Sequence, residues 1–186
     1  MDSKLQIISG QFRGRKLQLP PDARPTQNRA RIALFNMLES GIINPATPLI
    51  VWDAFAGSGA FGLECLSRYA TAQVTFTDVA PTSLKTIREN LATLAVGARA
   101  TVIQHDAIDA IKTLGAGADV VFLDPPYAIP EIGRTFVKRF AAVAKSGAIL
   151  IWEQDANASV MPDGVQWDVL RDKTYGRARF LILQRK

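Results

Sequence analysis

The sequence predicts an α/β fold in which a mostly parallel sheet is covered by helices on both faces. Apolar runs of strand length alternate with amphipathic stretches along most of the chain. Several of the runs are continuously apolar, which is typical of strands buried on both faces. Each of the first four runs also ends in an aspartate or is followed by one, and these acids meet at one edge of such a sheet.

The first 48 residues lack the regular alternation of strands and helices, and we predict that they form a small basic extension beside a main domain at 49–186. Residues 5–19 alternate around a glycine-containing turn, which indicates a β-hairpin that ends at Pro20 and Pro21. A loop follows, and residues 28–40 are predicted to be a helix with Asn28 as its N-cap.

The first half of the main domain opens with an apolar run at 49–55, predicted to be a buried strand. A glycine turn then begins a helix at 57–70, and a second strand covers 73–78. The stretch 81–95 is an amphipathic helix, because its leucine and isoleucine residues recur at spacings of three and four. Pro81 suits the first turn of that helix.

The second half continues the alternation and completes a predicted sheet of seven strands. Short helices are expected at 106–114 and 130–145. The five further strands are expected at 100–106, 119–124, 147–154, 165–172 and 177–184, the last two joined at Tyr175 and Gly176.

Composition bounds the possible functions of this chain. Its 186 residues suffice for one core, and nearly half of them are apolar, which argues against disorder. A single cysteine, Cys65, excludes an internal disulfide, and with a single histidine, His105, it cannot build a usual structural zinc site. We therefore expect no metal. No apolar run reaches membrane-spanning length and no signal peptide is recognisable, so we expect a cytoplasmic protein.

The positive charge lies at one end of the chain. Residues 1–31 contain seven basic and two acidic side chains, a net charge of +5, whereas the other 155 residues contain fifteen of each. A basic extension beside a neutral domain suits a surface that binds phosphates. A solvated surface that only aids solubility is the alternative at this stage.

The predicted carboxyl edge of the sheet carries a ligand site. Asp53 precedes a turn in which Gly57, Gly59 and Gly62 let a ligand approach the backbone. Asp78 and Asp106 follow the next two strands. An acid at a strand end can simply cap the next helix, but four of them together favour a shared ligand. This turn alone would also suit a nicotinamide dinucleotide, and an oxidoreductase stays open on that basis.

The segment Asp124-Pro125-Pro126-Tyr127 makes the prediction more specific. Two prolines fix the backbone and remove N–H donors, so carbonyl acceptors remain beside a carboxylate and an aromatic ring. An exocyclic amine of a base has two N–H donors on a flat ring. Asp124 and the Pro125 carbonyl suit the two hydrogens, and Tyr127 suits stacking on the base. The alternative is a turn with an aromatic lid.

Together these motifs resemble the bacterial 16S ribosomal RNA guanine-N2 methyltransferase family. The resemblance rests on D-A-F-A-G-S-G-A-F-G-L-E and D-P-P-Y, preceded by R-G-R-K-L and R-P-T-x-x-R-x-R-x-x-L-F-N, and it extends over almost the whole chain. It implies a Rossmann-like methyltransferase fold. The implied cofactor is S-adenosyl-L-methionine, with S-adenosyl-L-homocysteine as product. The implied partner of a monomeric enzyme is ribosomal RNA, within the small subunit or an assembly intermediate.

The resemblance also implies roles for individual residues. Asp124, Pro125, Pro126 and Tyr127 would hold the target guanine as the catalytic motif. The cofactor would be bound by Asp53, Ala56, Gly57, Ser58, Gly59, Asp78, Val79, Asp106 and Ala107. The RNA backbone would be bound by Arg13, Arg15, Lys16, Arg24, Thr26, Arg29 and Arg31.

Two positions depart from the family pattern, and other functions stay open. Ile32 stands where the family has an acid, and Asp78 stands where it has a glutamate that also reaches ribose hydroxyls. A methyltransferase of adenine N6 in DNA or of protein glutamine would share the D-P-P-Y turn. A non-catalytic RNA-binding or assembly module is an alternative of another class.

Overall fold

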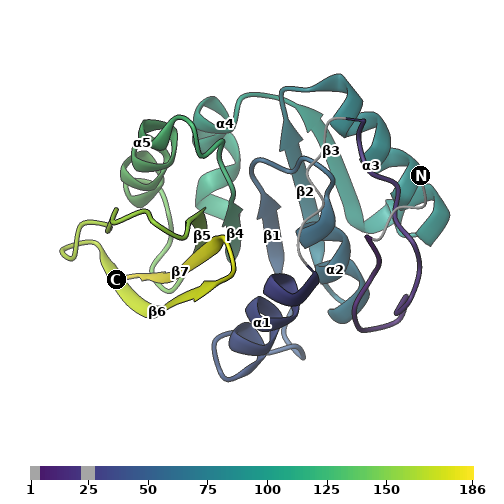
Figure 1. The fold of residues 1–186 in the computed structure, drawn as a ribbon, viewed down its shortest axis with the longest axis horizontal. Helices are drawn as coiled ribbons and strands as arrows, with labels where there is room; N and C mark the ends of the chain where they lie inside the picture. Colours follow the sequence, from purple (N-terminus) through teal and green to yellow (C-terminus); the bar gives the residue numbers. More distant parts are fainter. Residues whose placement is uncertain (1–4, 22–27) are drawn as a thin grey trace.

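The chain folds around one seven-stranded sheet with the order β3-β2-β1-β4-β5-β7-β6 (Figure 1). The computed structural model describes residues 5–21 and 28–186. Neighbouring strands from β3 to β5 run parallel, and β7 runs antiparallel to both β5 and β6. The strands are β1 (Ile50–Asp53), β2 (Gln73–Asp78), β3 (Ala100–Gln104), β4 (Val120–Leu123), β5 (Ile149–Asp155), β6 (Trp167–Tyr175) and β7 (Ala178–Arg185).

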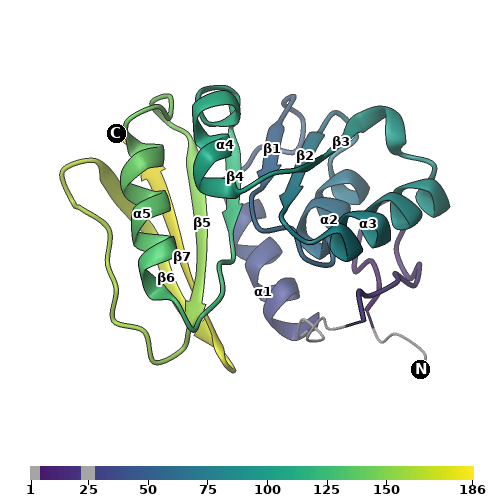
Figure 2. The same ribbon diagram turned by 90° about the horizontal axis from the view of Figure 1, so that it is seen from above.

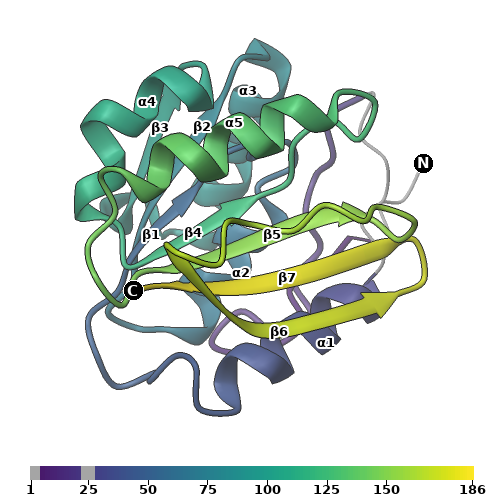
Figure 3. The same ribbon diagram turned by 90° about the vertical axis from the view of Figure 1, so that its left-hand side faces the viewer.

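Helices cover both faces of the sheet, as predicted. They are α1 (Asn28–Glu39), α2 (Ala60–Arg68), α3 (Pro81–Leu94), α4 (Ala107–Leu114) and α5 (Pro130–Ala141), with short 3₁₀ turns η1 (Gly97–Arg99) and η2 (Gly115–Gly117). Side chains of α1, α2 and α3 belong to one buried cluster, and those of α4 and α5 belong to the other. Figures 2 and 3 show α1 and α5 on opposite sides of the antiparallel end of the sheet.

The predicted order of strands and helices in the main domain is confirmed, and most boundaries move by a few residues. The largest shift at the site is in the helix expected at 57–70, which begins at Ala60. Gly57 and Gly59 have φ values of +51° and +74°, in the left-handed region, so the chain is still turning there. The helix expected to run to residue 145 ends at Ala141. In the part of the chain that the structure describes, no helix is long and apolar enough to cross a bilayer.

The two arms of the predicted N-terminal hairpin pair, but they form no regular strands. Backbone hydrogen bonds of 2.9 Å join the arms, from the Ile7 N–H to the Arg15 carbonyl and from the Leu17 N–H to the Leu5 carbonyl. Residues 5–19 form no regular strands but one antiparallel bridge, between Gln6 and Lys16. Regular strands are interrupted because several backbone N–H groups of the segment donate to side chains of the neighbouring helices. The Ile8 and Ser9 N–H groups donate to the Glu64 carboxylate of α2, and the Gln18 N–H donates to the Asn90 side chain of α3 at 2.9 Å.

The N-terminal residues pack into the main domain and share its core. Leu5, Ile7 and Leu17 are at most 2% exposed and belong to the same buried cluster as α1, α2 and α3. Gly10 shows how close the approach is, because a Cβ built there would lie 2.1 Å from the Ser67 carbonyl oxygen. The segment therefore forms part of the wall of the main domain.

Candidate active site

The first part of the site is the turn after β1. Asp53 is 1% exposed, and its Oδ2 accepts a hydrogen bond from the Gly62 N–H at 3.0 Å. Burial raises the pKa of the Asp53 carboxyl to about 8, opposed by the Gly62 hydrogen bond and assisted by the charge of Asp78. Asp53 thus stands as a buried acid directly beneath the glycine turn.

Asp78 fixes this turn from the end of β2. Its Oδ2 accepts from the Gly57 N–H at 2.7 Å, and its Oδ1 accepts from the Ala80 N–H at 2.8 Å. A Cβ built on Gly57 would meet no atom nearer than the Phe55 carbonyl oxygen, at 4.0 Å. The space in front of the turn is therefore open, and each Asp78 oxygen keeps a lone pair for a ligand hydroxyl.

Asp106 has a structural role at the start of α4. It is the N-cap of α4, and its Oδ1 accepts from the Ile108 and Asp109 N–H groups at 2.8 and 3.3 Å. Asp106 therefore caps the helix, which was the alternative to ligand binding, and its exposed carboxylate remains accessible at the edge of the sheet. Val79 is 62% exposed beside Asp78, whereas Ala107 is buried.

The Asp-Pro-Pro-Tyr segment follows β4 at the same edge. Pro125 is buried, and the Pro126 carbonyl accepts from the Ile129 N–H at 3.1 Å, which closes the turn. Asp124 keeps some exposed surface, but its carboxyl is largely withdrawn from water. This desolvation raises the pKa of Asp124 well above its usual range, and the charges of Glu153 and then Asp53 raise it further.

Glu153, on β5, is a site residue that the sequence analysis missed. It is 9% exposed, and its Oε1 accepts a hydrogen bond from the Tyr127 hydroxyl at 2.8 Å. Burial raises the pKa of Glu153, and the Tyr127 hydrogen bond opposes that shift. The signal in the sequence was the acid that directly follows the apolar run at 149–152, at the same end of its strand as the other strand-end acids.

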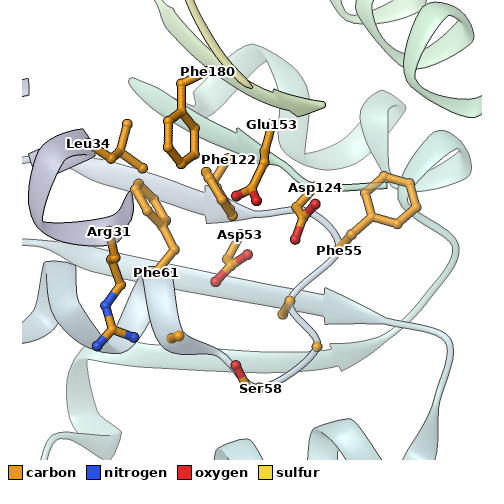
Figure 4. A pocket seen from close by; sticks show the side chains of 13 residues that line it. Arg31, Leu34, Asp53, Phe55, Ser58, Phe61, Phe122, Asp124, Glu153 and Phe180 are labelled. Carbon is orange, nitrogen blue, oxygen red and sulfur yellow. The ribbon is translucent and has the colours of Figure 1, made fainter. Parts of the chain in front are cut away.

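One pocket of about 220 Å³ joins the glycine turn to the Asp-Pro-Pro-Tyr segment (Figure 4). Three carboxylates line it, from Asp53, Asp124 and Glu153, together with one cation, Arg31. The rest of the wall consists of Leu34, Phe55, Ala56, Gly57, Ser58, Ala60, Phe61, Phe122 and Phe180. The predicted catalytic and cofactor-binding residues that lie outside this wall follow the strand ends beside it: Gly59, Asp78, Val79, Asp106, Ala107, Pro125, Pro126 and Tyr127.

The predicted RNA-binding residues separate into three groups. Arg13, Arg15, Lys16 and Arg29 are exposed. Arg24 and Thr26 lie outside the described residues. Arg31 is only 3% exposed and lines the pocket, and a side chain buried in this way does not present itself to an RNA backbone. The burial of Arg31 therefore argues against the predicted phosphate contact.

The residues of the pocket fit S-adenosylmethionine. Open space in front of Gly57 admits the ligand, buried carboxyls suit its positive groups, and Arg31 carries unpaired donors for its carboxylate. In the part of the chain that the structure describes, no group of three or more His, Cys, Asp or Glu is placed to hold a metal ion. The doubly wound sheet and this pocket define the class: the protein is an S-adenosylmethionine-dependent methyltransferase.

Comparison with known proteins identifies the family. A family model described as "conserved hypothetical protein 95" matches residues 5–184. The chain is 33% identical to the ribosomal RNA small subunit methyltransferase D of Escherichia coli strain K12, over 98% of this chain and 91% of that protein. The chain belongs to this family.

Solved structures agree with that identification. The E. coli protein YhhF, provisionally assigned as a methyltransferase, matches with a TM-score of 0.84 and 32% identity over 98% of both chains. An RNA methyltransferase from Salinibacter ruber, solved in complex with S-adenosyl-L-homocysteine, matches with a TM-score of 0.64 over 86% of this chain and 92% of that one. At 16% identity, the latter likeness concerns the fold.

Proposed function

We propose that this enzyme methylates the exocyclic N2 amine of a guanine in 16S ribosomal RNA of the small subunit. The observation that carries the proposal is the Asp-Pro-Pro-Tyr turn, which shares one edge of the sheet with the glycine turn after Asp53. The relatives named small subunit methyltransferase D support ribosomal RNA as the substrate. The choice of guanine N2 rests on the sequence motifs and is the finer part of the proposal.

The protein's contribution is to position the amine. Asp124 accepts one amine hydrogen and the Pro125 carbonyl accepts the other, which turns the nitrogen lone pair toward the methyl donor. Tyr127 stacks on the base while its hydroxyl stays bound to Glu153. S-adenosylmethionine supplies a methyl group already activated by the positive sulfur. Orientation of this kind contributes up to about 7–11 kcal/mol.

The raised pKa values in the pocket suit this chemistry. Burial raises the pKa values of Asp53, Asp124 and Glu153, and neighbouring carboxylates raise those of Asp53 and Asp124 further, so protonated carboxyls are favoured without a ligand. A positively charged ligand offsets that effect and favours the ionised forms. Asp124 then accepts a hydrogen bond from the amine, whose proton becomes acidic only as the methyl group arrives, so a weak acceptor suffices.

RNA binding is assigned to the exposed basic residues near the N-terminus. Arg13, Arg15 and Lys16 lie on the segment that packs against α2 and α3, and Arg29 lies on α1, next to the pocket wall. Arg24 and Thr26 remain sequence-based assignments. A stacked base must be extruded to reach the pocket, at a cost of a few kcal/mol, so we expect a target in a loop or an exposed junction.

The test is a tritium-transfer assay from labelled S-adenosylmethionine. Ribosomal RNA, small ribosomal subunits, subunit assembly intermediates, duplex DNA and a protein-only fraction are offered side by side, and labelled products are digested to nucleosides or amino acids. Label in N2-methylguanosine from small-subunit RNA is expected, and the most active particle identifies the substrate. Asp124→Asn serves as the catalytic control and should lose most of the label.

Other outcomes would redirect the proposal. Label in N6-methyladenine or in glutamine would retain the fold and the amine chemistry but replace the substrate. Bound cofactor and bound RNA with no label anywhere would favour the non-catalytic module. RNA affinity with almost no dependence on salt would contradict the basic surface, because each neutralised phosphate adds a slope of about −0.7 to −0.9 in log K against log salt.

A further inference from the structure

Arg31 is an unusual residue for a pocket wall. Its side chain, on α1, is 3% exposed, and its Nη2 donates to the Gln6 carbonyl and, at 3.3 Å, to Asn28 Oδ1. Its Nε and Nη1 atoms are buried without a hydrogen-bond partner among the described residues. Buried donors left unpaired are costly, and a charged group raises that cost.

The nearest acid does not satisfy Arg31. Glu64 lies 4.0 Å away, measured from Arg31 Nε to Oε2, which is beyond hydrogen-bond distance. Both Glu64 oxygens are already engaged, by the Ile8 and Ser9 N–H groups and by Arg68 Nε at 2.7 Å. Burial lowers the pKa of Arg31; the charge of Glu64 opposes this shift and that of Arg68 adds to it. A further anion beside Arg31 would therefore be favourable.

The pocket places the Arg31 cation on the same wall as the Asp53 carboxyl, an arrangement that suits a ligand with both a carboxylate and an ammonium group. Arg31 shares the wall with Asp53, Gly57 and Ser58. Figure 4 shows Arg31 and Ser58 toward one end of the pocket, with Glu153 and Phe180 toward the other and Asp53 between them. An α-amino acid group carries an ammonium and a carboxylate on one carbon. Asp53 offers the charge that the ammonium prefers, and Arg31 offers the charge that the carboxylate prefers.

We propose that Arg31 binds the carboxylate of the methionine part of S-adenosylmethionine, while Asp53 faces its ammonium group. A guanidinium suits this task because it presents several donors in a fixed plane and binds carboxylates through two parallel hydrogen bonds. The proposal concerns cofactor binding only, so it stands or falls separately from the choice of guanine N2.

The test compares two ligands that differ in the carboxylate alone. S-adenosylhomocysteine and its decarboxylated analogue S-adenosyl-3-thiopropylamine are titrated calorimetrically into the wild type and into Arg31→Met. The substitution should weaken S-adenosylhomocysteine binding by about 10- to 100-fold, the range of a lost charged hydrogen bond, and should change binding of the analogue by about twofold or less. Arg139→Met, an exposed arginine on α5, is the matched control and should leave both affinities unchanged.

Two results would overturn the proposal. Equal weakening of both ligands by Arg31→Met would show that Arg31 only supports the fold of the pocket. Equal affinity of the wild type for both ligands would show that no group reads the carboxylate, and this comparison needs no variant to fold. If Arg31→Met does not fold, Arg31→Lys retains the charge and should retain a measurable preference for the carboxylate. No RNA is present, so failure of the RNA proposal would leave these affinities unaffected.

Discussion

Replacing Glu64 with glutamine should detach the N-terminal segment from the main domain. Glu64 is completely buried on α2, and its oxygens accept from Ile8 N–H at 2.8 Å, Ser9 N–H at 2.9 Å and Arg68 Nε at 2.7 Å. A glutamine of the same shape turns one of these acceptors into an NH₂ donor that faces other donors. It also removes the negative charge that balances Arg31 and Arg68.

The magnitude follows from burial. Breaking a buried ion pair by neutralising one partner costs about 3–5 kcal/mol, because the remaining charge stays buried and unpaired. For a chain of this size, each kcal/mol lowers the melting temperature by about 2–4 °C, so Glu64→Gln should lower it by about 6–20 °C. Glu89→Gln is the control, since Glu89 is 42% exposed and only 3.9 Å from exposed Lys85. It should change stability by about 0.5 kcal/mol or less.

Calorimetric melting of the three proteins without ligand measures the effect, and amide hydrogen exchange locates it. Exchange at Ile8 and Ser9 should accelerate in Glu64→Gln more than exchange at the sheet strands. A Glu64→Gln protein that melts within about 1 °C of the wild type, with Ile8 and Ser9 still protected, would refute the reasoning. The contacts of Glu64 with Ile8, Ser9 and Arg68 would then contribute little to the free energy of unfolding.

Three further predictions concern the site. Asp53 keeps its proton up to a pH of about 8 in the folded protein and loses it near pH 4 when unfolded, so urea-unfolding stability without ligand should fall as pH rises through that window. Asp53→Asn should make this slope shallower, and the remaining slope comes from Asp124 and Glu153, whose pKa values are also raised. Tyr127→Phe removes the hydrogen bond that lowers the pKa of Glu153, so the acidic limb of kcat/KM against pH should move upward; an unchanged profile would exclude Glu153 from the titration. Gly62→Ala places a Cβ 2.3 Å from the Phe76 ring and should cost about 1–3 kcal/mol in thermal unfolding, whereas Gly97→Ala, with open space, should not destabilise.

The sheet and its helices were predictable because the pattern of buried side chains can be recognised within short stretches of the sequence. Continuous apolar runs such as that of β1, and the regular spacing of apolar residues in α3, express burial directly in the sequence. The acids at the strand ends were predictable for the same reason, since topology alone brings the ends of parallel strands together. Asp53 and Asp124 accordingly line one pocket, and Asp78 fixes the turn between them.

The parts that could not be predicted depend on distant contacts. The pairing of the two N-terminal arms was predictable from their local alternation. The interruption of their strands was not, because the Ile8 and Gln18 donors pair with Glu64 and Asn90, more than 50 residues away. Arg31 was grouped with its exposed neighbour Arg29, although its spacing to Leu34, Phe35 and Leu38 places it on the buried face of α1. Glu153 directly follows the apolar run of β5, and its proximity to Tyr127 arises only when β5 pairs with β4.

The hydrogen bonds that hold the N-terminal segment against α2 and α3 also affect the order in which the chain folds during synthesis. Synthesis proceeds from the N-terminus, so residues 5–19 leave the ribosome before their partners exist. Ile8 waits 56 residues for Glu64, and Gln18 waits 72 residues for Asn90. Until then the apolar side chains of Leu5, Ile7 and Leu17 have no core to enter. The basic segment that leaves the ribosome first can therefore dock fully only after α3 has been made, and truncated chains that end before α3 should leave it open to proteolysis.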